Sequence, residues 1–300
     1  MNNKQADIAI VIPVYKSTFF EETLESVVQQ TDKNYNIYIG NDASGDDKIE
    51  PIIKSIRERE NLNYKRFENN MGQISLPLHW NRCLDMVQNE KWIWLFSDDD
   101  VMDDNCLENF RKTQKANSGI RLFRFNTVKF CDEILLKENI FPERVSIIDF
   151  LKLKFGYSQE SYVVEYIFDK SLLDDIGKFS GFPLGWCSDD LFWIKTALCT
   201  DILTIQDSLV YWRYSNQNTS GRINTTDSAS KKILACRMFM HELKDMDIFL
   251  MDKDVETLFF HWIMRQFHYL SNHLNKTDVK EFLTDIYEVL PDVHKNTLKI

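Results

Sequence analysis

The 300-residue sequence has no C-x-x-C pair, no N-terminal stretch with the pattern of a secretory signal and no long apolar run. Its six cysteines contain no C-x-x-C pair, which is typical of reduced thiols, so we expect a cytosolic protein. The N-terminal stretch MNNKQADIAIVIPVY has no basic region followed by a long apolar segment, so no secretory signal is expected. No apolar run reaches the roughly 18 residues of a membrane helix. Any membrane contact should therefore be peripheral, at the inner face of the membrane.

Basic charge is also scarce. The 46 acidic residues outnumber the 36 basic ones, which gives a formal net charge of −10, and no local basic stripe is present. Such a surface repels polyanions, so we expect no nucleic-acid partner. A small anionic ligand is still compatible with this charge, because a bound divalent cation can invert the local field.

The first hundred residues alternate between strand and helix patterns. Residues 7–15 are nearly continuous in apolar residues, which is typical of a strand buried on both faces, and residues 35–42 and 91–96 are predicted as further strands. Helical spacing follows the first strand, where Thr18 and Glu21 have the spacing of a capping box. This alternation predicts βαβ units in a three-layer α/β sheet, and ligands bind such sheets beyond the carboxyl ends of the strands.

The alternation becomes looser after residue 120, and the chain is almost wholly helical from Ser228 onward. We therefore predict an α/β domain at residues 1–225 and a helical appendage at residues 226–300. No Gly/Pro linker marks the boundary near residue 225, so its position is approximate.

Three acidic clusters lie at the predicted ends of strands or the start of a helix. The apolar segment WIWLF runs directly into Asp98, Asp99 and Asp100, and unit charges about 4 Å apart repel by roughly 4 kcal/mol at an effective dielectric of 20. Either solvent in an exposed turn or a hard cation such as Mg²⁺ would relieve this repulsion. Asp42 ends another strand in a segment of ordinary turn formers, NDASGD. The pair at 189–190 begins a predicted helix, where it could cap the helix or act in catalysis.

Taken in order, these segments resemble the family 2 glycosyltransferases. The motifs that carry the resemblance are the strand IAIVIPVY, the helix ending SVVQQT, the turn NDASGDD, the loop NNMG with Asn81 in the next helix, and WIWLFSDDD. The resemblance is close over residues 7–110 and looser over residues 180–215. It implies a GT-A fold, which is a Rossmann-like three-layer α/β/α arrangement with a mixed, mostly parallel sheet.

The resemblance also implies roles for individual residues. Such enzymes transfer a sugar from a nucleotide diphosphate donor, with inversion at the anomeric carbon. The match assigns Pro13, Tyr15 and Asp42 to the nucleoside pocket and includes Asn81 in the donor site. It gives Asp98, Asp99 and Asp100 to Mg²⁺ or Mn²⁺ beside the diphosphate.

The family places its general base in an acidic pair at the start of a helix. Counting back from Lys195 gives Asp189 as the base, and a one-residue slip would give Asp190 instead. Trp186 beside this pair could stack on an acceptor sugar or be buried in the core.

The sequence departs from the family pattern in three places. Asn41 replaces the first acid of the usual strand-end pair, and Ser97 replaces the usual first acid of the D-x-D segment, so the metal ligands are either Asp98 with Asp100 or Asp99 with Asp100. The Arg that often precedes the helical Asn is missing, and His79 or Arg82 could contact phosphate in its place.

The leading hypothesis is a metal-dependent, inverting glycosyltransferase with a UDP-linked donor. Its acceptor would be a glycan or lipid-linked saccharide in polysaccharide or cell-envelope assembly. The alternatives are a catalytically silent nucleotide-sugar-binding or scaffold protein on the same fold, and a phosphohydrolase, which is disfavoured because no aspartate lies in a nucleophile motif. The polar segment at 211–221, with Arg213, Ser215 and Ser220, is either a loop that closes over the donor or a plain surface loop.

Overall fold

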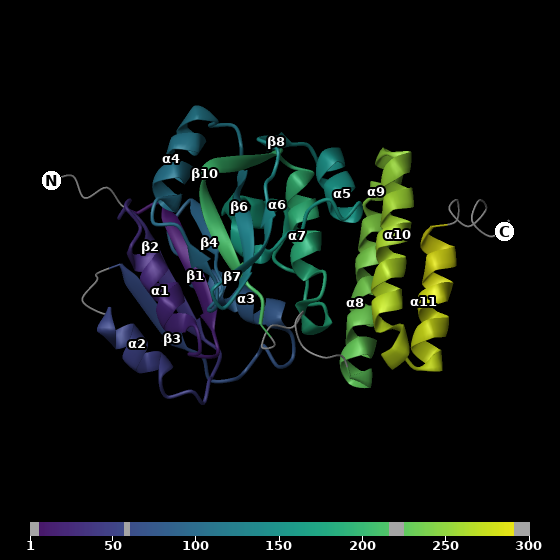
Figure 1. The fold of residues 1–300 in the computed structure, drawn as a ribbon, viewed down its shortest axis with the longest axis horizontal. Helices are drawn as coiled ribbons and strands as arrows, with labels where there is room; N and C mark the ends of the chain where they lie inside the picture. Colours follow the sequence, from purple (N-terminus) through teal and green to yellow (C-terminus); the bar gives the residue numbers. More distant parts are fainter. Residues whose placement is uncertain (1–5, 57–60, 216–224, 291–300) are drawn as a thin grey trace.

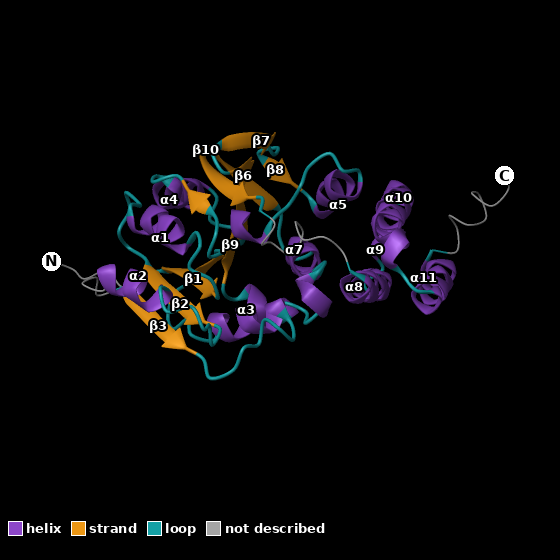
Figure 2. Ribbon diagram, turned by 60° about the horizontal axis from the view of Figure 1, so that its bottom comes forward, coloured by secondary structure: helices purple, strands orange, loops and turns teal. Residues whose placement is uncertain are grey.

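The structure is a computed structural model that describes residues 6–56, 61–215 and 225–290. Its described strands form one ten-stranded sheet with the central order β3-β2-β1-β4-β9-β6-β10-β5, while β7 pairs with β6 and β8 pairs with β10 (Figures 1 and 2). The pairings give one direction to β1–β4, β6 and β10 and the opposite direction to the other four, so the sheet is mixed and mostly parallel. The strands are β1 (Ile8–Val14), β2 (Asn36–Asn41), β3 (Leu62–Arg66), β4 (Trp92–Leu95), β5 (Val101–Met102), β6 (Leu122–Cys131), β7 (Ile134–Asn139), β8 (Arg144–Val145), β9 (Tyr166–Asp169) and β10 (Ile202–Arg213).

The strand register brings the predicted polar segments to one edge of the sheet. All seven residues of β1 are buried, as the apolar sequence predicts. Val14 is level with Asn41 of β2, and Val11 is level with Leu95 of β4. The residues that follow β1, β2 and β4 therefore leave the sheet on the same side.

Helices cover both faces of the sheet (Figure 2). One face carries Ile8, Ile10 and Ile12 and packs against α1, α2 and α4; the other carries Ala9 and Val11 and packs against α3, α5 and α7. This confirms the predicted three-layer arrangement. The helices are α1 (Phe20–Val28), α2 (Ile49–Ser55), α3 (Leu76–Leu84), α4 (Cys106–Ala116), α5 (Ile147–Phe155), α6 (Leu172–Ile176), α7 (Ser188–Ala197), α8 (Thr226–Asp245), α9 (Ile248–Met251), α10 (Lys253–Leu270) and α11 (Lys276–Val289).

The capping box predicted at Thr18 and Glu21 does not form. Helix α1 begins at Phe20, its N-cap residue is Phe19, and no side chain caps it. Thr18 lies one residue before the cap position, so its hydroxyl is not placed to bond the first free N–H groups of the helix.

The C-terminal helices are continuous with the core of the sheet. Helices α8 and α10 lie beside α5 and α7 (Figure 1), and their buried residues belong to the same apolar cluster as Ala9 and Val11. The ring of Phe155 lies 6.4 Å from that of Phe239 and 4.9 Å from that of Phe259. No helix within the described ranges has the length and apolar character to cross a membrane.

Candidate functional site

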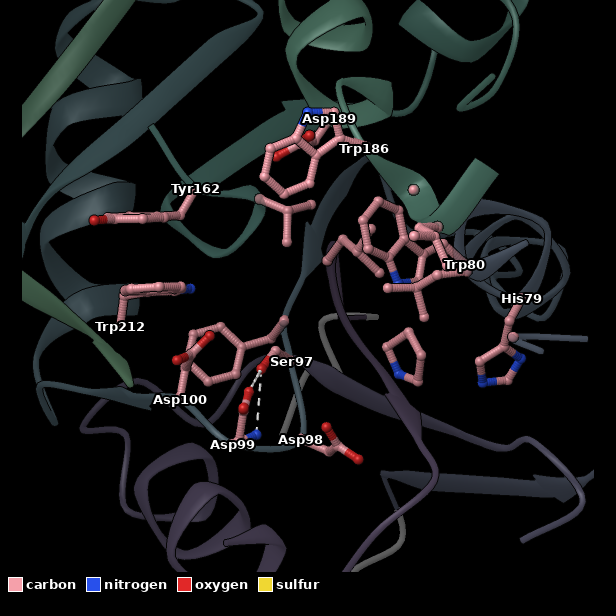
Figure 3. A pocket seen from close by; sticks show the side chains of 18 of the residues that line it. His79, Trp80, Ser97, Asp98, Asp99, Asp100, Tyr162, Trp186, Asp189 and Trp212 are labelled. Atoms are coloured by element: carbon pink, nitrogen blue, oxygen red, sulfur yellow. Dashed lines mark hydrogen bonds between the residues drawn. The ribbon is translucent and has the colours of Figure 1, made fainter. Parts of the chain in front are cut away.

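A cavity of about 820 Å³ lies beyond the carboxyl ends of β1, β2 and β4 (Figure 3). Its wall is built by the loops after these strands, the turn before α7, the ends of β10 and α5, and one side of α10. The residues that line the cavity include Pro13, Tyr15, Lys16, Asp42, His79, Trp80, Ser97, Asp98, Asp99, Asp100, Lys154, Tyr157, Tyr162, Trp186, Asp189, Asp190, Trp212, Trp262 and Gln266. The residues assigned to the donor pocket, the metal and the base are in this wall except Asn81, and Arg82, the alternative phosphate contact, is absent from it as well.

The turn after β4 forms one side of the cavity, and backbone donors fix two of its three aspartates. Asp98 Oδ2 accepts hydrogen bonds from the backbone N–H groups of Tyr15 (3.0 Å) and Lys16 (3.3 Å), which join the turn to the end of β1. Asp100 is almost fully buried, and its Oδ1 accepts from the Arg213 N–H at 2.7 Å. Asp99 lies between them and bonds the Ser97 hydroxyl, so the serine in the family's usual acidic position orients an acid (Figure 3).

Burial raises the pKa of all three carboxyl groups, and the charge of Asp99 adds to this effect at Asp98 and Asp100. Burial, together with the charge of Asp99, raises the pKa of Asp98 to about 7 and that of Asp100 well above its usual range. Burial also raises the pKa of Asp99. A cation shared with a substrate diphosphate would relieve this repulsion, and Mg²⁺ needs only one or two protein carboxylates in such a site. The donor set fits this arrangement, although no group of three or more His, Cys, Asp or Glu side chains within the described residues could hold an ion alone.

Arg213 binds the acidic turn through hydrogen bonds to Asp99 and Asp100. It is the last residue of β10 and is buried, with its guanidinium between the rings of Phe19 (4.2 Å) and Phe130 (4.4 Å). Its Nε donates to the Asp99 carbonyl at 2.7 Å, and its Nη2 donates to Glu22 at 2.6 Å. The sequence pattern placed Arg213 in a polar loop and gave no signal for this role, while Ser220 of that loop lies outside the described residues.

Asp42 is buried in the cavity wall, and protein donors occupy its carboxylate. Its oxygens accept from the backbone N–H groups of Met71 and Gly72, both at 2.8 Å, and it pairs with Arg82. His79 lies 3.5 Å away, and burial lowers its pKa to about 4, so this imidazole is neutral at pH 7. His79 and Arg82, the two alternatives for a phosphate contact, thus both contact Asp42. The Asp42 carboxylate also bonds the backbone of the 69–72 loop at the cavity wall.

Asn81 faces the adjacent chain segment and is absent from the cavity wall. Its Nδ2 donates to the Phe179 carbonyl at 2.8 Å, and its Oδ1 accepts from the Phe179 N–H at 3.1 Å. Both polar atoms of the amide therefore tie α3 to the segment before α7.

The acidic pair at the start of α7 lies across the cavity from the acidic turn (Figure 3). Asp190 forms an ion pair with Lys154 at the end of α5. Burial and the charge of Asp190 raise the pKa of Asp189 to about 7, against the opposing effect of Lys154. The structure thus distinguishes a paired carboxylate from one suited to exchange a proton near neutral pH.

Backbone strain shapes the turn that carries this pair. Leu184 and Cys187 have φ of 57° and 62°, in the left-handed region that ordinary residues avoid. Trp186 lies between them, and its indole projects into the cavity beside Asp189 (Figure 3). Strained residues persist where the surroundings over-determine them, which is common at functional sites.

Aromatic rings form much of the remaining wall. Tyr162 and Trp212 stack with centroids 4.2 Å apart and planes within 6°, and Trp80 lies on the other side of the cavity (Figure 3). Flat apolar faces next to polar tips suit ligands such as sugars and bases, which present both kinds of surface.

Comparison with known proteins agrees with this geometry. Residues 9–129 match the family model described as Glycosyl transferase family 2. No curated protein sequence matches the chain.

Several solved structures share the fold. S. aureus TarS 1–349, solved in complex with UDP-GlcNAc, is 16% identical, with a TM-score of 0.72 over 94% of this chain and 80% of that one. The mannosyltransferase PcManGT from Pyrobaculum calidifontis, in complex with GDP-Man and Mn²⁺, is 13% identical, with a TM-score of 0.55 over 99% of this chain and 89% of that one.

Proposed function

Because residues 9–129 form a family 2 glycosyltransferase domain on a GT-A fold, we propose that this glycosyltransferase is an inverting enzyme that uses a nucleotide diphosphate sugar, with UDP as the nucleotide. The acceptor is a hydroxyl group of a glycan or lipid-linked saccharide. One observation carries the proposal: the acidic turn at 98–100 and the carboxyl of Asp189 line opposite sides of one cavity, with room between them for donor and acceptor (Figure 3).

The donor diphosphate lies at the acidic turn in this proposal. Pro13, Tyr15 and Asp42 form the adjoining wall, where the nucleoside fits, and the Lys16 side chain adds a cation to the same side. Asp98 and Asp99 are half-buried residues of the cavity wall and would hold Mg²⁺ or Mn²⁺ there, together with the more deeply buried Asp100. When bound, such an ion neutralises charge on the departing diphosphate. The complex of PcManGT with GDP-Man and Mn²⁺ supports this use of a metal.

Asp189 acts as the general base. Its carboxylate takes the proton of the acceptor hydroxyl while the acceptor oxygen forms its bond to the anomeric carbon. The bond from that carbon to the diphosphate oxygen breaks on the opposite side, and its electron pair leaves with the nucleoside diphosphate. This in-line displacement inverts the anomeric centre, and the positions of the base and the donor site on opposite sides of the cavity support it.

The test measures nucleotide-sugar binding by calorimetry and slow donor hydrolysis, with and without Mn²⁺, for UDP-glucose, UDP-galactose, UDP-N-acetylglucosamine and GDP-mannose. Asp99→Asn and Asp100→Ala should lose metal-dependent donor binding, because they remove carboxylate ligands or displace the turn. Asp104→Asn alters an exposed acid outside the cavity and serves as the matched control. Donor binding that ignores both Mn²⁺ and the turn would rule out the metal role.

The same panel separates an enzyme from a catalytically silent nucleotide-sugar-binding protein. A silent protein would bind a donor with no hydrolysis or transfer in any variant, whereas the proposed enzyme hydrolyses its donor slowly. We place the enzyme in the cytoplasm, at most peripherally attached to the membrane; six free cysteines agree with a reducing compartment.

A further inference from the structure

Helix α10 lies outside the residues that match the family model, yet it contributes to the cavity. Trp262 and Gln266 are one turn apart on this helix, and both are in the cavity wall. Trp262 is almost fully buried, with its ring packed against Phe155 at 5.7 Å, whereas Gln266 is half-buried. The C-terminal region therefore supplies a polar group to the cavity as well as apolar cover for the sheet.

Tyr157 connects α10 to the end of α5. Gln266 Nε2 donates a hydrogen bond to the Tyr157 hydroxyl at 2.8 Å, and that hydroxyl lies 3.5 Å from the Trp262 carbonyl. The Tyr157 backbone has φ of 55°, which is strained for an aromatic residue, and the residue is 40% exposed. Tyr157 is also part of the cavity wall.

These residues lie at the Asp189 end of the cavity. Lys154, which is three residues before Tyr157, forms the ion pair with Asp190, and its charge acts on both Asp189 and Tyr157. Gln266, Tyr157 and Lys154 therefore line the same side of the cavity as the proposed base. The acidic turn at 98–100 lies across the cavity from that base (Figure 3).

From this arrangement we propose that Tyr157, Trp262 and Gln266 form a binding subsite for an acceptor saccharide in the cavity that also contains Trp186 and the base. The inference rests on the proposed function, because an acceptor must reach Asp189. Tyr157 is 40% exposed and offers an aromatic face to the C–H side of a sugar ring, whereas Trp262 is almost fully buried and supports the subsite by packing. The primary amide of Gln266 can both donate to and accept from sugar hydroxyl groups. Among the described residues no hydrogen bond to Gln266 Oε1 is found, so this acceptor is available to a sugar hydroxyl. Tyr157 is a positioning residue that orients the amide.

The test titrates the whole protein, saturated with UDP and Mn²⁺, with saccharide probes and follows tryptophan fluorescence. The probes are p-nitrophenyl and octyl glycosides of glucose, galactose and N-acetylglucosamine, and the disaccharides lactose and maltose. Gln266→Leu keeps the shape of the side chain and removes its polar atoms, and Tyr157→Phe removes the hydroxyl that orients it. His268→Ala, an exposed change on the same helix, is the control.

Saccharide affinity should fall roughly three- to tenfold in Gln266→Leu and Tyr157→Phe and stay unchanged in His268→Ala, while nucleotide-sugar affinity stays the same in all three. The subsite is overturned if saccharide affinity is unchanged in both variants, if nucleotide-sugar affinity falls in parallel, or if the unmodified protein binds none of the probes. Binding that needs the octyl chain supports the subsite and assigns it a lipid-linked saccharide. Failure of the unmodified protein to bind any nucleotide sugar, read in a separate titration, would defeat the proposed function and the subsite together.

Discussion

Two adjacent aspartates at the start of α7 have different surroundings. Asp190 pairs with Lys154, whereas the pKa of Asp189 is raised to about 7 by burial and by the charge of Asp190. The sequence could not separate these residues, because one residue of alignment slip exchanges them. Lys154 distinguishes them because it pairs with Asp190, and this contact forms only when α5 packs on α7.

The first prediction at the residue scale concerns Asp189→Asn. An amide cannot take the acceptor proton, so transfer should fall roughly 10²- to 10⁴-fold. Donor binding should persist, since Asp189 lies across the cavity from the acidic turn. The check is a transfer assay with calorimetric donor titration; full transfer in Asp189→Asn together with its loss in Asp190→Asn would move the base to Asp190.

The second prediction concerns the pH dependence of transfer. A base with a pKa of about 7 is protonated and inactive below that pH, so kcat should rise about tenfold per pH unit up to about 7 and then level off. The charged groups that act on Asp189 are Asp190 and Lys154. Asp190→Asn removes a negative neighbour and frees the Lys154 cation, so it should shift the rise to lower pH.

The control for this profile is Lys154→Met, which removes the cation and should shift the rise to higher pH. Shifts in the same direction in both variants, or none in either, would show that Asp189 does not set the profile. Thermal melts of each variant at each pH separate these shifts from unfolding.

At the scale of elements, the family resemblance predicts the helix that contains Asn81 but not the contact that its side chain makes. The sequence placed it in a helix near the donor site, and the structure does place it in α3. Its amide, however, bonds both backbone groups of Phe179. The side-chain direction depends on the segment before α7, which is almost a hundred residues away in the chain.

We predict that Asn81→Ala lowers the free energy of unfolding by about 2 kcal/mol, because two hydrogen bonds are lost and the backbone of buried Phe179 is left unpaired. Lys112→Ala, on the exposed side of α4, should change it by less than about 0.5 kcal/mol. Urea denaturation measures both. A loss of donor affinity at unchanged stability would instead return Asn81 to the donor site.

At the scale of the whole molecule, the sheet and the C-terminal helices share one apolar cluster. We retain the division near residue 225 as a proposed boundary between the α/β domain and the helical region. Phe239 of α8 is fully buried, with its ring 6.4 Å from Phe155 of the α/β region and 5.8 Å from Trp262 of α10. If either region unfolded, apolar side chains of the other region would be exposed to water.

Phe239→Ala should therefore destabilise the whole chain by about 3–5 kcal/mol. Far-ultraviolet circular dichroism and tryptophan fluorescence should still report one coincident unfolding transition. Met238→Ala, a partly exposed neighbour on the same helix, should have a much smaller effect. Two separate transitions in the unmodified protein would show that the regions unfold independently.

Local sequence patterns are enough to specify several strands of the fold. The apolar runs of β1, β2 and β4 are long enough to specify buried strands, and the acids that follow WIWLF had to lie where that strand leaves the core. Parallel neighbours then bring those ends together at one edge of the sheet. The three-layer sheet, the helical C-terminus and the position of the cavity follow from this pattern.

The contact partners of the site side chains depend on tertiary packing. Arg213 behind the acidic turn, Lys154 beside Asp190 and Gln266 in the cavity wall are each brought to the site from a distant element. Charge and burial at a site sum over every element packed around it, and the spacing along one segment does not encode that sum. The sequence therefore predicts which residue types form the site. Their hydrogen-bond partners, ion pairs and pKa shifts depend on contacts between distant elements of the fold.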